Sequence, residues 1–220
     1  MTQHANANDR EWDDQRSEGR TATVFRPVLI EAEDFAGFCL VRNLSSSGMM
    51  GHVYTDFAED TPISLQFGPG SIVIGSIKWC NEGRIGVEFD EEISVTHLLE
   101  EMAMKNVGGK PVRAPRLRLQ CDGELTLRDK SLKFELQDIS QRGIKVRSSS
   151  LQPGDEVFVQ LDGLKTRKAI VRWIQGGAAG LNFLLPLPFD ELARWVIWRN
   201  SDRMPPLPGH NIARTIEKTR

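Results

Sequence analysis

The sequence predicts a mainly β protein made of two similar small units, each an antiparallel barrel or sandwich of short strands followed by a helix. The first observation is an internal repeat, in which segments of the first half return in the second half in the same order. The second is a series of short runs rich in β-branched and aromatic residues, separated by turn signals. The third is a set of apolar residues at helical spacing near the end of each half.

Four pairs of segments carry the repeat. The segment that begins at Asn43 returns at Asp138, an offset of 95, and the other three return at an offset of 94. The pairs are 43–48 with 138–143, 61–67 with 155–161, 77–79 with 171–173, and 86–89 with 180–183. Matches that keep their order and spacing indicate two copies of one fold of about 90 residues.

Short strands are expected in both copies. In the second copy, Ala169, Val171 and Trp173 alternate with Ile170 and Arg172, which predicts a half-buried strand over 165–173. Gly and Pro turns separate the runs, and many short strands at this spacing are typical of an antiparallel barrel or sandwich. The strands expected in the first copy are Val24–Ile30, Phe38–Arg42, Ile63–Phe67, Ile72–Trp79 and Ile85–Phe89.

A helix is expected to close each copy. Ser94 or Thr96 can cap the first helix. We expect Trp195 and Trp198 to pack within the protein rather than to form a platform for stacking a ligand. The apolar residues at helical spacing are Leu98, Leu99 and Met102 in the first copy, and Phe189, Leu192, Trp195 and Val196 in the second.

These patterns divide the chain into four parts. We expect a flexible acidic arm over 1–15, a first domain over 16–106, a second domain over 107–200 and a mobile tail over 201–220. The linker between the domains is expected near Asn106–Lys110, where two adjacent glycines break the helix.

The net charge of −2 hides an asymmetry between the halves. Residues 1–106 hold 8 Lys and Arg against 18 Asp and Glu, whereas residues 107–220 hold 20 against 12. This asymmetry favours two units with different partners, although opposite charges also suit halves that face each other, or charges that are only solvated.

Composition and motifs exclude several classes of protein. The hydrophobic share of 40% and the charged share of 26% are typical of a soluble globular chain. We expect no membrane span, because no uninterrupted apolar run is long enough to cross a bilayer, and no secretory signal, because the segment 1–20 is polar and acidic. The common catalytic motifs are absent, so no enzyme activity and no cofactor are expected.

The cysteines and histidines do not predict a metal site. Cys39, Cys80 and Cys121 lack CxxC spacing, and no two of the four histidines lie close enough in the sequence to form a metal clip. We expect the cysteines to be small buried residues in a reducing cytoplasm.

Two motifs stand close together in the first copy. Arg16-Ser-Glu-Gly-Arg20 comes first, and Asn43-Leu-Ser45-Ser-Ser-Gly48 follows it. The combination, at this spacing, resembles the RxxxR…(D/N)xSxxG signature of PilZ domains, and the strand Gly86–Phe89 with the helix after it also resembles that family. The second copy resembles it from about Arg113 to Arg199.

The resemblance implies two six-stranded β-barrels, each with a helix at one end. It also implies a bacterial receptor for cyclic di-GMP whose arginine-bearing arm wraps the ligand, with a role in regulating motility or biofilm formation. The residues that the motif matches in the first copy are Arg16, Arg20, Asn43, Ser45 and Gly48.

The chemistry of these residues suits the same ligand. The guanidinium groups of Arg16 and Arg20 match phosphate oxygens and the O6 and N7 atoms of guanine, and they can stack on a purine. Asn43 can accept from a guanine N–H, and the Ser45 hydroxyl can donate to a base or a phosphate. Gly48 permits a positive φ, and it removes a Cβ where the ligand must approach.

The second copy departs from the signature. Pro115 stands at the position that matches Arg20, and the nearest arginines, Arg113 and Arg116, are spaced RxxR. Without an arm cation, the acidic residue of the second motif is expected to face an anionic ligand uncompensated, so we do not expect tight binding there. The remaining candidates for a second site are Asp138, Ser140 and Gly143.

The sequence therefore predicts a cytoplasmic cyclic di-GMP receptor that passes its signal to a protein partner, the basic second domain being the candidate contact. A nucleotide-independent adaptor is the first alternative. Arg16 and Arg20 are the sequence feature that distinguishes a receptor from such an adaptor. A nucleic-acid-binding regulator that uses the basic half is the second alternative, but no DNA-binding helix motif supports it.

Overall fold

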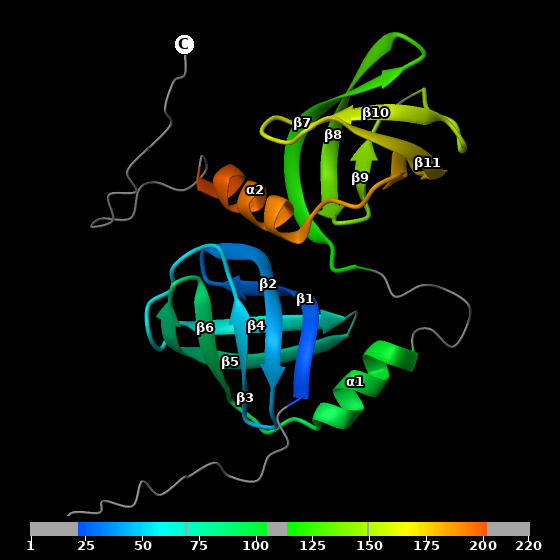
Figure 1. The fold of residues 1–220 in the computed structure, drawn as a ribbon. Helices are drawn as coiled ribbons and strands as arrows, with labels where there is room; N and C mark the ends of the chain where they lie inside the picture. The colour runs from blue at the N-terminus through cyan, green and yellow to red at the C-terminus, as the bar shows by residue number, and fades with distance from the viewer. Residues whose placement is uncertain (1–21, 69, 105–113, 149, 202–220) are drawn as a thin grey trace, which may run out of the picture.

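The protein folds into two closed antiparallel barrels, each followed by a helix (Figure 1). The computed structural model describes residues 22–68, 70–104, 114–148 and 150–201. The predicted fold class is confirmed in its barrel form. The expected arm, the expected linker near Asn106–Lys110 and all but the first residue of the expected tail lie outside these residues.

The first barrel is formed by six strands in the order β1-β2-β3-β6-β5-β4. All five strands expected in this copy are present, and β3 is an additional short strand. The elements are β1 (Ala22–Ala32), β2 (Phe35–Leu44), β3 (Gly48–His52), β4 (Pro62–Gly68), β5 (Ser71–Asn81), β6 (Arg84–Phe89) and α1 (Val95–Met104).

The second barrel repeats this arrangement, with strand order β10-β11-β12-β9-β8-β7. Its strands correspond one to one to those of the first barrel, as the repeat predicted. The elements are β7 (Leu117–Leu127), β8 (Lys130–Ser140), β9 (Gly143–Arg147), β10 (Glu156–Gln160), β11 (Arg167–Gln175), β12 (Ala178–Phe183) and α2 (Phe189–Ser201).

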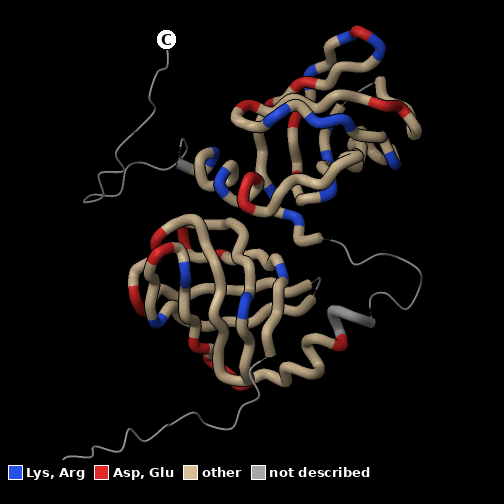
Figure 2. The backbone as a smooth tube through the Cα atoms, viewed as in Figure 1, with Lys and Arg blue, Asp and Glu red and all other residues tan. Residues whose placement is uncertain are grey.

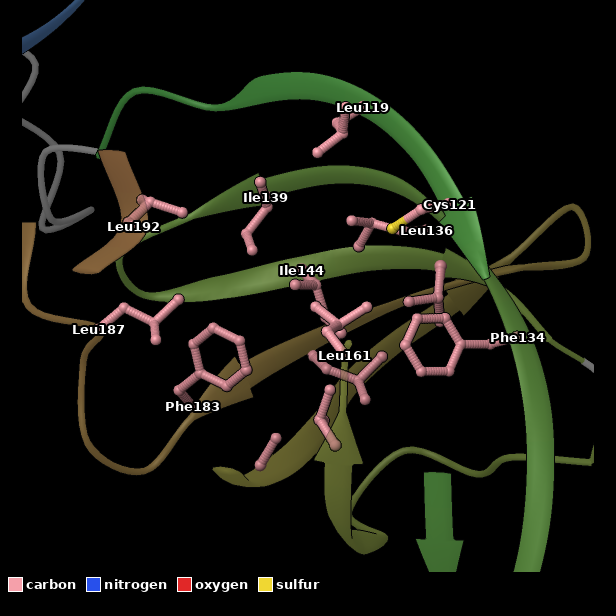
Figure 3. Packing of buried hydrophobic residues seen from close by; sticks show 14 of the residues in the cluster. Leu119, Cys121, Phe134, Leu136, Ile139, Ile144, Leu161, Phe183, Leu187 and Leu192 are labelled. Atoms are coloured by element: carbon pink, nitrogen blue, oxygen red, sulfur yellow. The ribbon is translucent and has the colours of Figure 1, made fainter. Parts of the chain in front are cut away.

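Inward-facing aliphatic residues fill each barrel. In the second barrel, Leu136, Ile139 and Ile144 are completely buried and pack with Phe134 and Leu192 (Figure 3). Closing the sheet gives every strand two neighbours, so the barrel has no free edge. Burial of this kind contributes roughly 1.5–3 kcal/mol for each large aliphatic side chain.

The cysteines fit the same picture. Cys39 and Cys121 are buried, as expected, whereas Cys80 is half-buried, and none of the three forms a disulfide. Burial raises the pKa of the Cys39 thiol to about 12. This thiol therefore stays protonated at neutral pH and behaves as a small apolar residue.

The helices begin and pack largely as expected. Ser94 caps α1, because its hydroxyl oxygen accepts from the His97 amide at 3.3 Å, whereas Thr96 lies inside the helix. Trp195 is buried and donates through Nε1 to the Asp162 carbonyl at 2.7 Å. Trp198 is 39% exposed, so only Trp195 is a core residue.

A β-bulge changes which way one tryptophan points. The register of β11 with β12 shifts between Val171 and Trp173, so Ala169 and Val171 are buried while Trp173 is 41% exposed. The alternation predicted through Trp173 is therefore wrong beyond Val171, because the inserted residue, Arg172, reverses the side-chain order. The first barrel has the same bulge between Ile77 and Trp79.

The two barrels meet through α2, which packs on β2 of the first barrel (Figure 1). The Phe189 ring contacts the rings of Phe38 and Tyr54, with centroids 6.3 and 6.1 Å apart. The Arg194 guanidinium lies 4.7 Å from the centroid of Tyr54, and Asn200 donates to the Ala36 carbonyl at 3.0 Å. This interface is largely aromatic.

The Lys and Arg residues and the Asp and Glu residues are distributed unevenly along the chain in both barrels (Figure 2). The ion pairs formed by the described residues lie within one barrel or the other, such as Arg167 with Glu191 at 2.7 Å and Lys78 with Glu88 at 3.0 Å. Opposite charge therefore does not hold these parts of the halves together through ion pairs.

Replacing Phe189 with alanine is expected to loosen the contact between the barrels. The variant loses both ring contacts, and we expect the free energy of unfolding to fall by about 2–3 kcal/mol, less than for a fully buried ring. In calorimetry, the two barrels of the variant should then unfold in two resolved transitions, whereas in the parent the unfolding of the two barrels is more strongly coupled. Leu185→Ala, at a residue 73% exposed, is the control and should leave the trace unchanged. Identical traces for both variants would contradict the assigned interface.

Candidate functional site

The Asn43–Gly48 motif forms the turn between β2 and β3. The Ser45 amide and the Ser45 hydroxyl both donate to the Gly48 carbonyl, at 2.8 and 3.0 Å. Two donors on one carbonyl fix the turn, so the hydroxyl proton that we expected to reach a base or phosphate is used within the protein here. The Ser45 oxygen keeps its ability to accept.

Gly48 is required by close packing rather than by its backbone conformation. A Cβ at this position would stand 2.4 Å from the Val87 carbonyl oxygen of β6, the strand that pairs with β3. The φ of Gly48 lies outside the left-handed region, so the positive φ that a glycine permits is not used here. The missing side chain instead allows β3 to approach β6.

The same turn holds the chain segment that leads into α1. The Phe89 amide donates to the Ser47 carbonyl at 2.9 Å, and the Ile93 amide donates to the Ser46 carbonyl at 2.8 Å. The motif therefore connects three parts of the barrel, namely the ends of β2 and β6 and the start of α1. A ligand that moved this turn would act directly on the approach to the helix.

A surface hollow of about 520 Å³ lies beside the turn. Asn43 lines it from β2, and Lys78 with Trp79 lines it from β5. The Trp79 indole lies against Gly86, where a Cβ would come within 2.0 Å of the indole nitrogen. Trp173 and Gly180 repeat this pair in the second barrel, so the tryptophan is part of the shared fold.

Lys78 is the one cation among the described residues that line this hollow. Its ammonium pairs with Glu88 at 3.0 Å and with Asp60 at 3.3 Å. Hydrogen bonds to these carboxylates, the one to Glu88 first, raise the Lys78 pKa. Because its charge is already compensated, an anionic ligand needs further cations from elsewhere in the chain.

The second barrel builds its motif in the same way. Ser140 is buried and its hydroxyl donates to the Gly143 carbonyl at 3.1 Å. A Cβ on Gly143 would stand 2.0 Å from the Leu181 carbonyl oxygen. The Leu187 amide donates to the Gln141 carbonyl at 2.7 Å, and the Phe183 amide donates to the Arg142 carbonyl at 3.0 Å. These hydrogen bonds correspond to the ones that the Ser46 and Ser47 carbonyls accept in the first barrel.

Residues 112–198 match the family model described as PilZ domain. The second barrel is a PilZ domain. The matched residues include Asp138, Ser140 and Gly143, and they span the strands of this barrel together with most of α2. The first barrel has the same strand order and the same turn, so the chain carries this fold twice.

The solved structures that resemble this chain share little sequence identity with it. "Crystal structure of the Borreliella burgdorferi PlzA protein in complex with c-di-GMP" is 12% identical, with 79% of this chain and 88% of that chain covered and a TM-score of 0.38. YcgR from Escherichia coli in complex with c-di-GMP is 13% identical, covers 81% and 85%, and has a TM-score of 0.34. No curated protein matches the chain.

In the PilZ domain of the second barrel, the acidic residue of the motif has a cation. Arg116 donates to Asp138 at 2.7 Å, so the expectation of an uncompensated carboxylate is wrong. Two further cations face Asp138 across the sheet, because Arg118 of β7 and Lys145 of β9 are its partners in strand register. Arg113 lies outside the described residues.

Sequence reasoning missed Arg118 and Lys145. They line a hollow of about 560 Å³ together with Asp138 and Asn200. The signal was present in the repeat, since the register of β7, β8 and β9 can be carried over from the strands that surround Asn43. Of the residues predicted for the first site, the structure brings together Asn43, Ser45 and Gly48, while Arg16 and Arg20 lie outside the described residues.

The described residues show neither a metal cluster nor a membrane-spanning helix. No group of three His, Cys, Asp or Glu side chains among them is arranged to hold a metal ion. No helix in the same part of the chain has both the length and the apolar character needed to cross a bilayer.

Proposed function

We propose that this PilZ protein is a cytoplasmic, non-catalytic receptor for cyclic di-GMP, and that the first barrel binds the ligand. Arg16 and Arg20 supply the guanidinium groups, while Asn43, Ser45 and Gly48 form the wall on which the ligand rests. No cofactor takes part. The second barrel, with Arg113, Arg116, Asp138, Ser140 and Gly143, is not proposed as a tight site for this ligand.

The single observation that carries the proposal is the presence of both motif halves at family spacing before and within the first barrel. Only this copy has two arginines in the RxxxR arrangement, Arg16 and Arg20, at the family's distance before the motif that begins at Asn43. Two guanidinium groups can each form paired hydrogen bonds with phosphate oxygens or with a guanine edge.

The charges in the hollow support a role for the arm. Lys78 is neutralised by Glu88 and Asp60, so a ligand with two phosphates gains little from it. Arginines brought by the preceding chain provide the missing positive charge. In the second barrel the guanidinium of Arg116 is already held by Asp138, and a ligand would have to break that pair to use it.

A calorimetric titration of the full chain with cyclic di-GMP tests the receptor proposal. We expect saturable binding, and we expect GMP at equal concentration to compete poorly because it offers one base and one phosphate. If the titration with cyclic di-GMP produces no binding heat, the result would favour a nucleotide-independent adaptor. Binding to random DNA that weakens steeply with salt would favour a nucleic-acid-binding regulator.

Ordering of the arm by the ligand is the proposed signal. Contacts with Arg16 and Arg20 would fix this segment on the first barrel and alter what a protein partner meets, directly or through the placement of the basic second domain. Amide hydrogen exchange over 16–23 is expected to slow by about tenfold or more when cyclic di-GMP is added. Equal exchange at saturating ligand would rule out this form of signalling while leaving the binding proposal intact.

A further inference from the structure

We propose that Phe25 and Arg42 form a stacking platform for a guanine base at the edge of the first-barrel site. The platform adds a base-recognition element to the motif residues. It rests on the proposed function, because it assumes that the first barrel binds a purine nucleotide.

Two adjacent β-bulges place this pair on the outer face of the barrel. The register of β1 with β2 shifts between Thr23 and Arg26, and that of β2 with β3 shifts between Val41 and Asn43. Val24 and Phe25 of β1 therefore stand opposite Arg42 of β2 without regular pairing. Val24 is buried, which leaves Phe25 as the β1 residue that accompanies Arg42. Thr23 pairs with Asn43, so the platform lies beside the motif.

The two side chains are already arranged against each other. The Arg42 guanidinium carbon lies 4.5 Å from the centroid of the Phe25 ring, which is a cation–π contact. Phe25 remains 65% exposed, so its ring is accessible to a ligand. Arg42 Nε is buried without a hydrogen-bond partner among the described residues, so a donor at this point lacks an acceptor.

A guanine base can use both side chains. Its flat face can stack on an aromatic ring or on a guanidinium plane, and its O6 and N7 atoms accept from guanidinium donors. Burial, together with the nearby Arg42 and Arg84 cations, lowers the His52 pKa, which favours the neutral imidazole near this face.

The second barrel provides an internal comparison. The offset of 95 that relates Asn43 to Asp138 places Gln120 and Gln137 at the positions of Phe25 and Arg42. The same bulges occur there, between Arg118 and Cys121 and between Leu136 and Asp138. The barrel therefore folds without an aromatic–arginine pair, and the pair in the first barrel is not required by the fold.

The test is titration of the full chain with cyclic di-GMP in the variants Phe25→Gln and Arg42→Gln, which carry the residues of the second barrel. Each is expected to weaken binding roughly 5- to 150-fold, the range for loss of one stacked base. Phe25→Trp keeps a stacking ring and should bind within about threefold of the parent. Phe158→Gln, at another half-exposed strand residue, is the matched control and should bind like the parent.

The outcomes separate the platform from the receptor proposal. If the parent binds and Arg20→Ala weakens binding, but Phe25→Gln and Arg42→Gln both bind like the parent, the platform is wrong and the receptor proposal stands. If the parent does not bind cyclic di-GMP, both are wrong. Loss of binding in Phe25→Gln and Arg42→Gln, with retention in Phe25→Trp and with unchanged thermal unfolding, establishes the platform.

Discussion

Replacing Arg20 with alanine is expected to weaken cyclic di-GMP binding roughly 10- to 150-fold. A charge-assisted, paired hydrogen bond contributes about 1.5–3 kcal/mol, and the described hollow offers no free cation in its place. Arg16→Ala should have a similar effect. Arg20→Lys should not restore binding, because an ammonium lacks the planar fork of a guanidinium.

Two control variants make this result specific. Arg10→Ala removes a charge from the same stretch of chain but lies outside the motif, so its affinity should stay within about threefold of the parent. Arg116→Ala removes the cation that pairs with Asp138 in the second barrel and should also leave the affinity nearly unchanged. Unchanged affinity in Arg16→Ala, Arg20→Ala and Arg20→Lys together would refute the assignment of the arm.

Gly48→Ala is expected to destabilise the first barrel even without ligand. The new methyl group would stand 2.4 Å from the Val87 carbonyl oxygen, and β3 cannot move away without breaking its pairing with β6. Overpacking of this kind costs about 1–3 kcal/mol, which should lower the denaturant midpoint measurably. Gly48 is thus expected to stabilise the first barrel as well as to contribute to ligand binding.

The neighbouring serine provides the control for this prediction. Ser47 lies in the same turn with an exposed side chain, and the Phe89 amide uses only its backbone carbonyl. Ser47→Ala should therefore unfold within about 0.5 kcal/mol of the parent. A stable Gly48→Ala variant that nevertheless loses cyclic di-GMP would show that this glycine serves the ligand alone.

The repeat made most of the fold predictable. Apolar alternation located the long strands, and Ser94 located the start of α1. The short strand β3 was missed, because Gly48–His52 contains two glycines and two methionines and no β-branched residue. Its strand pairing comes from its neighbours β2 and β6 rather than from its own propensity.

The parts that the sequence could not predict depend on bulges and on contacts between distant segments. Separate bulges turned Trp173 outward and placed Phe25 beside Arg42, and no local pattern marks such insertions. The packing of Phe189 on Phe38 and Tyr54 joins residues that are far apart in the sequence. The pairing of Arg116 with Asp138 likewise required the register of β7 with β8.

Chemical-shift mapping of the full chain tests most directly which barrel binds the ligand. The two motifs provide matched reporters, because the amides of Asn43, Ser45 and Gly48 correspond to those of Asp138, Ser140 and Gly143. On addition of cyclic di-GMP, the amide resonances of the first set are expected to shift and to saturate together, while those of the second set move little. Saturable shifts at the second set, with the first set unmoved, would contradict the account.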